Sequence, residues 1–135
     1  MAIDETLYVS VEEAISLHIL LMREWEERHF GVDNRDLLDS ALNRPRQAKN
    51  FVNADVHRQA ATLCFGLIKN HPWIGGNKRT ATFLMEAFLE INDLKLTAAD
   101  EEVYEMALKV ESNSWKVDEI KNWLRSKVEK LNART

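Results

Sequence analysis

The stretch NHPWIGGNKRTATF, residues 70–83, holds the residues best suited to chemistry. A histidine, two adjacent glycines, an asparagine and two adjacent cations follow one another there, immediately before an apolar run. A neutral imidazole can accept a proton from an attacking hydroxyl near neutral pH. His71 is therefore the candidate general base.

The glycines and cations after His71 are typical of an anion site. The first turn of a helix has backbone N–H groups without intrahelical partners, and the helix dipole places partial positive charge there. A glycine-containing turn lets those groups surround a phosphate, and Lys and Arg add formal charge. The pattern predicts a cradle for a triphosphate, formed by Gly75, Gly76, Asn77, Lys78 and Arg79.

Simpler interpretations of the same residues stand beside this one. Asn77 can be only a helix cap, and Lys78 with Arg79 can be only a solvated helix end, although cations in a first turn oppose the dipole. The Walker pattern G-x-x-x-x-G-K-[ST] is absent, because Arg79 separates Lys78 from Thr80. Trp73 is apolar between polar neighbours, so we expect it to anchor the loop in the core.

Helices are expected to position this stretch. Apolar residues recur at a period near 3.6 along the chain, which contains only 4 Gly and 2 Pro. The fourth predicted helix is apolar on nearly every side and is expected at the centre of the fold. The pattern predicts an all-α domain without a long strand, with helices over about 10–28, 33–44, 55–70, 78–92, 97–110 and 118–131.

Particular residues predict where these helices begin and end. Ser10 opens a capping box for the first helix, and Thr97 is expected to cap the fifth. Pro45 is expected to stop the second helix, because the residue before a proline is biased out of the helical region. Residues 45–54 are therefore predicted to form a loop.

Composition limits the function classes. A chain of 135 residues suits one domain over residues 1–135. The net charge of −4 argues against direct nucleic-acid binding. Cys64 is the only cysteine, which excludes an internal disulfide and favours a reducing compartment. Neither a signal peptide nor an uncharged stretch of about 20 residues that would span a bilayer is visible, so no membrane contact and a cytoplasmic setting are expected.

The stretch HPWIGGNKRTA, residues 71–81, resembles the signature of the Fic/Doc superfamily, and most closely its death-on-curing (Doc) branch. The AMP-transferring branch continues with Gly-Arg after the asparagine, whereas the Doc branch continues with Lys-Arg-Thr-Ala, as residues 78–81 do here. GVDNRDLLDSALNRPRQ and AATLCFGLIKNHPW, residues 31–47 and 60–73, also look like Doc proteins. The resemblance covers about residues 8–95.

This resemblance implies a Fic (Fido) fold of about six helices around a central apolar helix. It also implies transfer of part of ATP to a hydroxyl of a protein. In the Doc branch the γ-phosphate moves to a translation elongation factor, whereas the other branch transfers AMP. The resemblance assigns His71 as general base and places Asn77, Lys78 and Arg79 at phosphate-holding positions.

A stand-alone Doc protein also implies a toxin–antitoxin system. Fic proteins are often restrained by a helix with the motif [S/T]-x-x-x-E-[G/N]. Thr97 and Glu101 have this spacing, but Glu102 follows instead of Gly or Asn. Self-inhibition is therefore not expected, and a separate antitoxin chain is.

One position departs from the family pattern, because Gly75 replaces the usual acidic residue that helps hold Mg²⁺. Mg²⁺ is implied by the resemblance, but which residues would bind it is unknown. The departure leaves two functions: a toxin that transfers phosphate or AMP, and a degenerate module that binds nucleotide or a protein without turnover. If Gly75 marks a lost metal ligand, Gly75→Asp is expected to raise transfer roughly tenfold.

Overall fold

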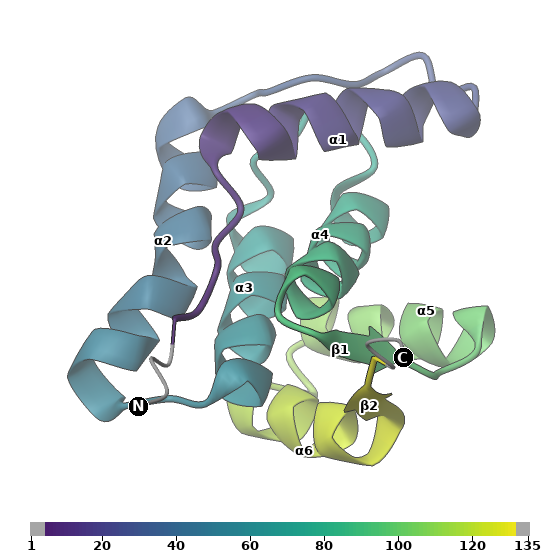
Figure 1. Ribbon diagram of the computed structural model, residues 1–135. Coiled ribbons are helices and arrows are strands. Elements are labelled where there is room, and N and C mark those ends of the chain that lie inside the picture. The colour runs from purple at the N-terminus through teal and green to yellow at the C-terminus, as the bar shows by residue number, and fades with distance from the viewer. Residues whose placement is uncertain (1–4, 132–135) are drawn as a thin grey trace.

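The computed structural model describes residues 5–131, and these form six helices and two short strands (Figure 1). The predicted all-α class is confirmed. In chain order the elements are α1 (Val11–Glu24), α2 (Arg35–Val52), α3 (Val56–Asn70), α4 (Asn77–Ile91), β1 (Leu94–Leu96), α5 (Asp100–Glu111), α6 (Val117–Lys127) and β2 (Val128–Lys130).

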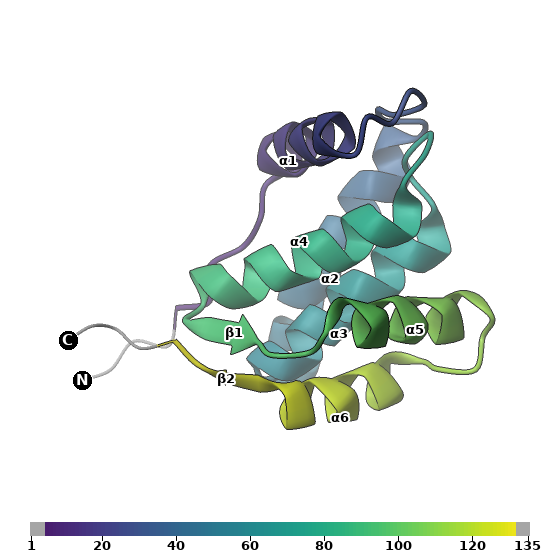
Figure 2. The same cartoon turned by 90° about the vertical axis from the view of Figure 1, so that its right-hand side faces the viewer.

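Helices α3 and α4 share the centre of the molecule. Helix α3 packs against α2, α4, α5 and α6, and α4 packs against α1, α3, α5 and β1. Helix α1 crosses above one end of this bundle, next to the turn between α3 and α4 (Figures 1 and 2). One hydrophobic cluster runs from Ala14 to Leu124, so the central helices that flank the turn are firmly held. Between residues 5 and 131, no helix is both long and apolar enough to cross a membrane.

Helix α2 contradicts the predicted loop at residues 45–54. Pro45 lies inside the helix, which continues to Val52 and ends at Asn53 in the left-handed conformation. Proline removes one backbone hydrogen bond, but packing can outweigh that local cost. Pro45 is itself buried, and the guanidinium of Arg46 lies 4.4 Å from the ring centre of Tyr8. These tertiary contacts hold the second half of α2 in place.

Three other predicted boundaries also shift. Helix α1 ends at Glu24 because Glu26 has a φ of 53°. Helix α5 begins at Asp100, since Thr97 bonds to the carbonyl of Lys127 instead of capping a helix. Helix α6 stops at Lys127 because β2 turns away to pair antiparallel with β1.

His18 is a buried polar residue in α1. Its Nδ1 lies 2.9 Å from Oγ1 of Thr80 in α4, and its Nε2 accepts a hydrogen bond of 3.0 Å from the N–H of Gly31. Because Nε2 accepts, the neutral ring carries its proton on Nδ1 and donates to Thr80. Burial lowers the pKa of His18 from 6.5 to about 4.

This pKa predicts a loss of stability in mild acid. In the unfolded chain His18 binds a proton below pH 6.5, but in the folded chain it does so only near pH 4. The free energy of unfolding should therefore fall as the pH drops through this window, by about 2 to 3 kcal/mol from this group at pH 4.5. Urea unfolding of wild type and His18→Phe at pH 7 and 4.5 isolates the effect, because the variant lacks it. Parallel losses in the two proteins would exclude His18 as the cause.

Candidate functional site

The turn between α3 and α4 positions every residue of the predicted site. His71 ends α3 in the left-handed conformation, with φ 52° and ψ 55°. Gly76 precedes α4 and is also left-handed, with a φ of 68° that glycine adopts without steric cost. We call residues 71–76 the motif turn. Its two left-handed ends reverse the chain and point the start of α4 toward the same side as His71.

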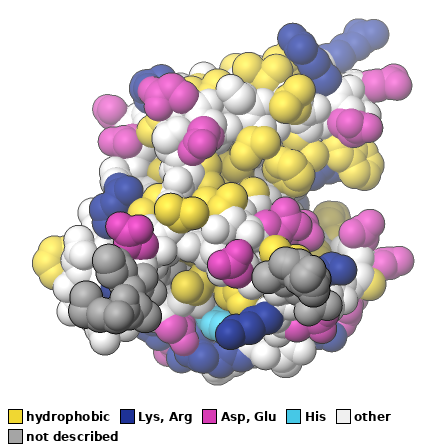
Figure 3. Space-filling view, in the orientation of Figure 1, with side chains coloured by type: hydrophobic (Ala, Val, Ile, Leu, Met, Phe, Trp, Pro, Cys, Tyr) yellow, Lys and Arg dark blue, Asp and Glu magenta, His cyan; other side chains and the backbone are white. Residues whose placement is uncertain are grey.

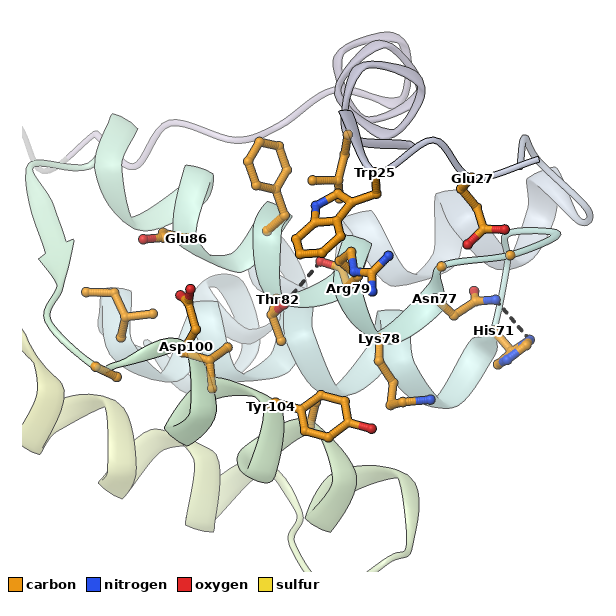
Figure 4. A pocket seen from close by; sticks show the side chains of 18 of the residues that line it. Trp25, Glu27, His71, Asn77, Lys78, Arg79, Thr82, Glu86, Asp100 and Tyr104 are labelled. Carbon is orange, nitrogen blue, oxygen red and sulfur yellow. Dashed lines mark hydrogen bonds between the residues drawn. The ribbon is translucent and has the colours of Figure 1, made fainter. Parts of the chain in front are cut away.

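Asn77 closes the motif turn onto itself. Its side chain is buried, accepts a bond of 3.0 Å from the N–H of Trp73 and donates one of 2.8 Å to the carbonyl of Trp73. Its Nδ2 also lies 3.2 Å from Nδ1 of His71 (Figure 4). Because Nδ2 is a donor, Nδ1 of His71 accepts, and the resting neutral ring carries its proton on Nε2. The His71 side chain is exposed, so a target hydroxyl can reach the ring, where the nitrogen without a proton can act as the base.

The connection between α1 and α2 lies along the motif turn. Val32 forms an isolated antiparallel bridge with Trp73, and the N–H of Ile74 donates to the carbonyl of Gly31 at 2.9 Å. The carbonyl of Pro72 accepts from the N–H of Asp33 at 2.8 Å. These bonds fix the outer edge of the motif turn, while the buried Trp73 side chain holds its inner edge in the core.

Glycine is needed at position 75 because the connection between α1 and α2 passes very close to its Cα. A Cβ built on Gly75 would stand 2.2 Å from the carbonyl oxygen of His29. The φ of Gly75 is not positive, so glycine at this position is explained by the contact and not by backbone strain. The gain expected from Gly75→Asp is opposed by this contact, since any side chain at position 75 must displace backbone.

We instead expect Gly75→Ala and Gly75→Asp to be destabilising. Overpacking of a tight contact typically costs about 1 to 3 kcal/mol, and here the opposing atom belongs to the main chain and cannot rotate away. Urea unfolding measures this loss, and Gly75→Asp should show no gain in Mg²⁺-dependent transfer. Wild-type stability of Gly75→Ala would mean that the α1–α2 connection does not lie on the motif turn.

A pocket of about 720 Å³ opens beside the motif turn. It lies between the end of α1, one face of α4 and α5, and hydrophobic side chains gather in the region below α1 (Figure 3). His71 and all five predicted phosphate-binding residues line this one pocket: Gly75, Gly76, Asn77, Lys78 and Arg79. The volume is in the range of small-molecule and cofactor sites.

Helix α4 points its first turn into this pocket. The start of α4 has no side-chain cap, although Gly76, Asn77 and Lys78 at that end all line the pocket. Uncapped N–H groups together with the helix dipole attract an anion. The side chain of Asn77 is fully used within the motif turn, so it shapes the cradle and leaves anion contact to the backbone.

Both cations of the cradle have partners from other helices. Nζ of Lys78 lies 3.1 Å from Oε2 of Glu111 at the end of α5. The guanidinium of Arg79 lies 4.0 Å from the ring centre of Trp25, just after α1. Figure 4 shows Trp25 above Arg79, and Lys78 on the same side of the pocket as Tyr104. The Lys78–Glu111 pair is partly exposed, so an anion of higher charge can replace the carboxylate.

Comparisons with known proteins decide the family. Residues 8–89 match the model of the Fic/DOC family. The chain belongs to the Fic/Doc family. It is also similar to a protein called Toxin Doc from Mycolicibacterium smegmatis (strain ATCC 700084 / mc(2)155). The two are 42% identical over 96 residues, which cover 69% of this chain and 70% of that protein.

The far end of this Fic/Doc pocket is acidic. Glu86 and Asp100 line it, opposite the cations at the start of α4 (Figure 4). Burial, together with Glu90 and Asp100, raises the pKa of Glu86. The pocket therefore holds Lys78 and Arg79 near the start of α4, with Glu27 lying beside Asn77, and two carboxylates at the far end (Figure 4).

The motif turn does not fit a metal held by residue 75. Gly75 brings no carboxylate, and a side chain there would meet the carbonyl of His29. Across residues 5–131, no three His, Cys, Asp or Glu side chains are grouped so that they could hold a metal ion. Glu86 and Asp100 lie at the far end of the pocket, away from the motif turn, so the chemistry proposed below depends on amides and cations.

Sequence reasoning missed the walls of the pocket. Trp25 and Glu111 are not among the residues predicted for the site, although they contact Arg79 and Lys78. Tyr104 lines the pocket from α5. These residues lie more than 20 positions from the motif, and their local patterns are those of ordinary surface helices. One weak signal was available in Trp25, which is a large aromatic residue among charged neighbours.

Proposed function

We propose that this chain is a Doc-type toxin that transfers the γ-phosphate of ATP to a hydroxyl of a protein, with a translation elongation factor as the expected target. The observation that carries the proposal is the convergence of His71 with the uncapped start of α4 in one pocket. A base and an anion cradle at such close range are what transfer of a phosphoryl group to a hydroxyl requires.

The two ends of the pocket suit a nucleoside triphosphate. The phosphates would lie at the start of α4, between Lys78 and Arg79. The amino group of a base is a hydrogen-bond donor, and Glu86 and Asp100 at the far end can accept from it. The same pocket therefore complements both the charged and the neutral ends of ATP.

In the proposed reaction, a ring nitrogen of His71 takes the proton of the target hydroxyl as its oxygen attacks the γ-phosphorus. An O–P bond forms to the target, and the bond between the γ-phosphorus and the bridging β-oxygen breaks. ADP leaves with that oxygen, and His71 releases its proton to water. Lys78, Arg79 and the N–H groups of α4 hold the phosphate charges during transfer, as catalysis of this kind demands.

Two alternatives belong to the same site. Transfer of AMP would need attack at the α-phosphorus, and Lys78 at the position where the AMP-transferring branch has glycine favours the γ-phosphate. A module that binds nucleotide without turnover is suggested by Gly75. The intact pair of His71 and Asn77, in contact at 3.2 Å, favours the enzyme.

A separate antitoxin chain is the expected control. The inhibitory segment that the sequence suggests, Thr97–Glu101, serves the fold, since Thr97 bonds to Lys127 and Glu101 is exposed on α5 outside the pocket. This segment therefore does not restrain the site. The similarity to Toxin Doc supports a partner of this kind.

Expression in bacteria tests the proposal. Without an antitoxin, the wild-type chain is expected to arrest growth, whereas His71→Ala at the same soluble level should not. His57→Ala is the matched control, because His57 lies at the other end of α3 and does not line the pocket. Normal growth with abundant folded wild type would contradict an unrestrained toxin.

A further inference from the structure

We propose that His18 is a positioning residue for this site: its neutral imidazole ties α1, the α1–α2 connection and α4 to the motif turn, and so sets where His71 and the cations stand. The consequence for transfer rests on the proposed function. The positioning itself depends only on the contacts of His18.

The His18 ring contacts three separate segments at once. It stacks on the buried Trp73 with ring centres 4.0 Å apart and an interplanar angle of 13°. Its Nδ1–H donates to Thr80, and its Nε2 accepts from Gly31, at 2.9 and 3.0 Å. Trp73 stands two residues after His71, and Thr80 follows Arg79 directly. One side chain therefore holds residues on both sides of the cradle.

The hydrogen bond between His18 and Gly31 is linked to the motif turn by a second hydrogen bond. Gly31 receives His18 at its N–H and offers its carbonyl to the N–H of Ile74, at 2.9 Å. Gly31 of the α1–α2 connection thus links His18 to Ile74 through two hydrogen bonds. The path from α1 to the outer edge of the motif turn is made of hydrogen bonds, whereas the path to its inner edge is the stack on Trp73.

No other side chain supplies this set of contacts. The surroundings of residue 18 require a flat ring with a hydrogen-bond donor on one edge and an acceptor on the other, and neutral histidine has all three. Phe30, Gly31, Trp73 and Thr80, which face the ring, carry no ionisable group, so no neighbouring charge favours the protonated form. Loss of the ring would leave the hydroxyl of Thr80 and the N–H of Gly31 without these partners, which loosens the segments they belong to.

The expected signature is a loss of rate without loss of ATP affinity. The cations and amides that bind phosphate stay on α4, but misplacement of His71 by about 1 Å can cost about 10²-fold in rate. For His18→Phe, which keeps a ring to stack, we expect transfer at saturating ATP to fall about 10- to 100-fold. The Kd for ATP should stay within about threefold of wild type.

Matched variants separate positioning from stability. Gln59→Met is the control, because Gln59 is also buried and makes two hydrogen bonds, but to Tyr8 and Ala54 away from the pocket. His18→Asn can replace the donor at Nδ1, and His18→Gln can replace the acceptor at Nε2. Each of these should restore part of the rate that His18→Phe loses.

The experiment combines amide hydrogen exchange with transfer assays, at a temperature where every variant is folded. We expect faster exchange at Ile74 and Thr80 in His18→Phe but not in Gln59→Met, together with the loss of rate. Wild-type exchange at both amides, or equal losses of rate in His18→Phe and Gln59→Met, would overturn the proposal. If wild type transfers nothing, the proposed function fails while exchange still decides the role of His18. If His18→Phe does not fold, His18→Gln carries the same comparison at Thr80.

Discussion

Replacing His71 with alanine is expected to slow transfer to protein by about 10²- to 10⁴-fold, the usual contribution of a general base. The fold should survive, because the His71 side chain is exposed and its hydrogen bond with Asn77 is a long one of 3.2 Å. Binding of ATP should also survive, since the cradle belongs to α4.

Single-turnover kinetics with saturating ATP measure this loss directly. His57→Ala provides the control for removing a histidine from α3. An unchanged rate in His71→Ala would show that the target hydroxyl loses its proton elsewhere, and the assignment of the base would be wrong.

Removing the cations is expected to have the next largest effect. Lys78→Ala and Arg79→Ala should each weaken ATP binding by about 10-fold or more, because a hydrogen bond to a charged group contributes about 1.5 to 3 kcal/mol. The deficit should be greatest at low salt, where screening is weakest. Arg79→Ala should also free the indole of Trp25, which now lies 4.0 Å from the guanidinium.

Calorimetry at two salt concentrations tests this prediction. Lys121→Ala is a suitable control, because Lys121 lies on α6 and does not line the pocket. Arg79→Lys separates charge from shape, since lysine keeps the charge but loses the planar fork. Equal affinities for ATP in wild type, Lys78→Ala and Arg79→Ala would reject the cradle.

Local patterns predicted the two helices that carry the site. Asp55 caps α3 and Gly76 precedes α4, so both helices begin close to the predicted residues. The capping box at Ser10 is also present. Each of these signals acts within about one helical turn, which is the range over which a sequence pattern reports structure reliably.

Predictions failed where distant residues decide the conformation. Pro45 has a strong local bias against helix, yet it continues α2 because its ring is buried and its neighbour packs on Tyr8. Val128 leaves the helical pattern because β1 offers a partner strand more than 30 residues earlier. Contacts of this kind have no local trace in the sequence.

Gly75 shows the same limit within the site. From the sequence it is a missing acid, and restoring the acid is the obvious repair. In the folded chain, the carbonyl of His29 occupies the space that a side chain would need. Glycine is therefore required at position 75 because folding places the α1–α2 connection against it.

Transfer from ATP labelled separately at the γ- and α-phosphates is the most direct test of the proposed function. Purified wild type is incubated with each nucleotide and bacterial lysate, and His71→Ala serves as the inactive control. We predict that the γ-label enters protein, that the α-label does not, and that His71→Ala transfers neither. Entry of the α-label would contradict phosphate transfer in favour of AMP transfer, and absence of both labels from protein would contradict an enzyme.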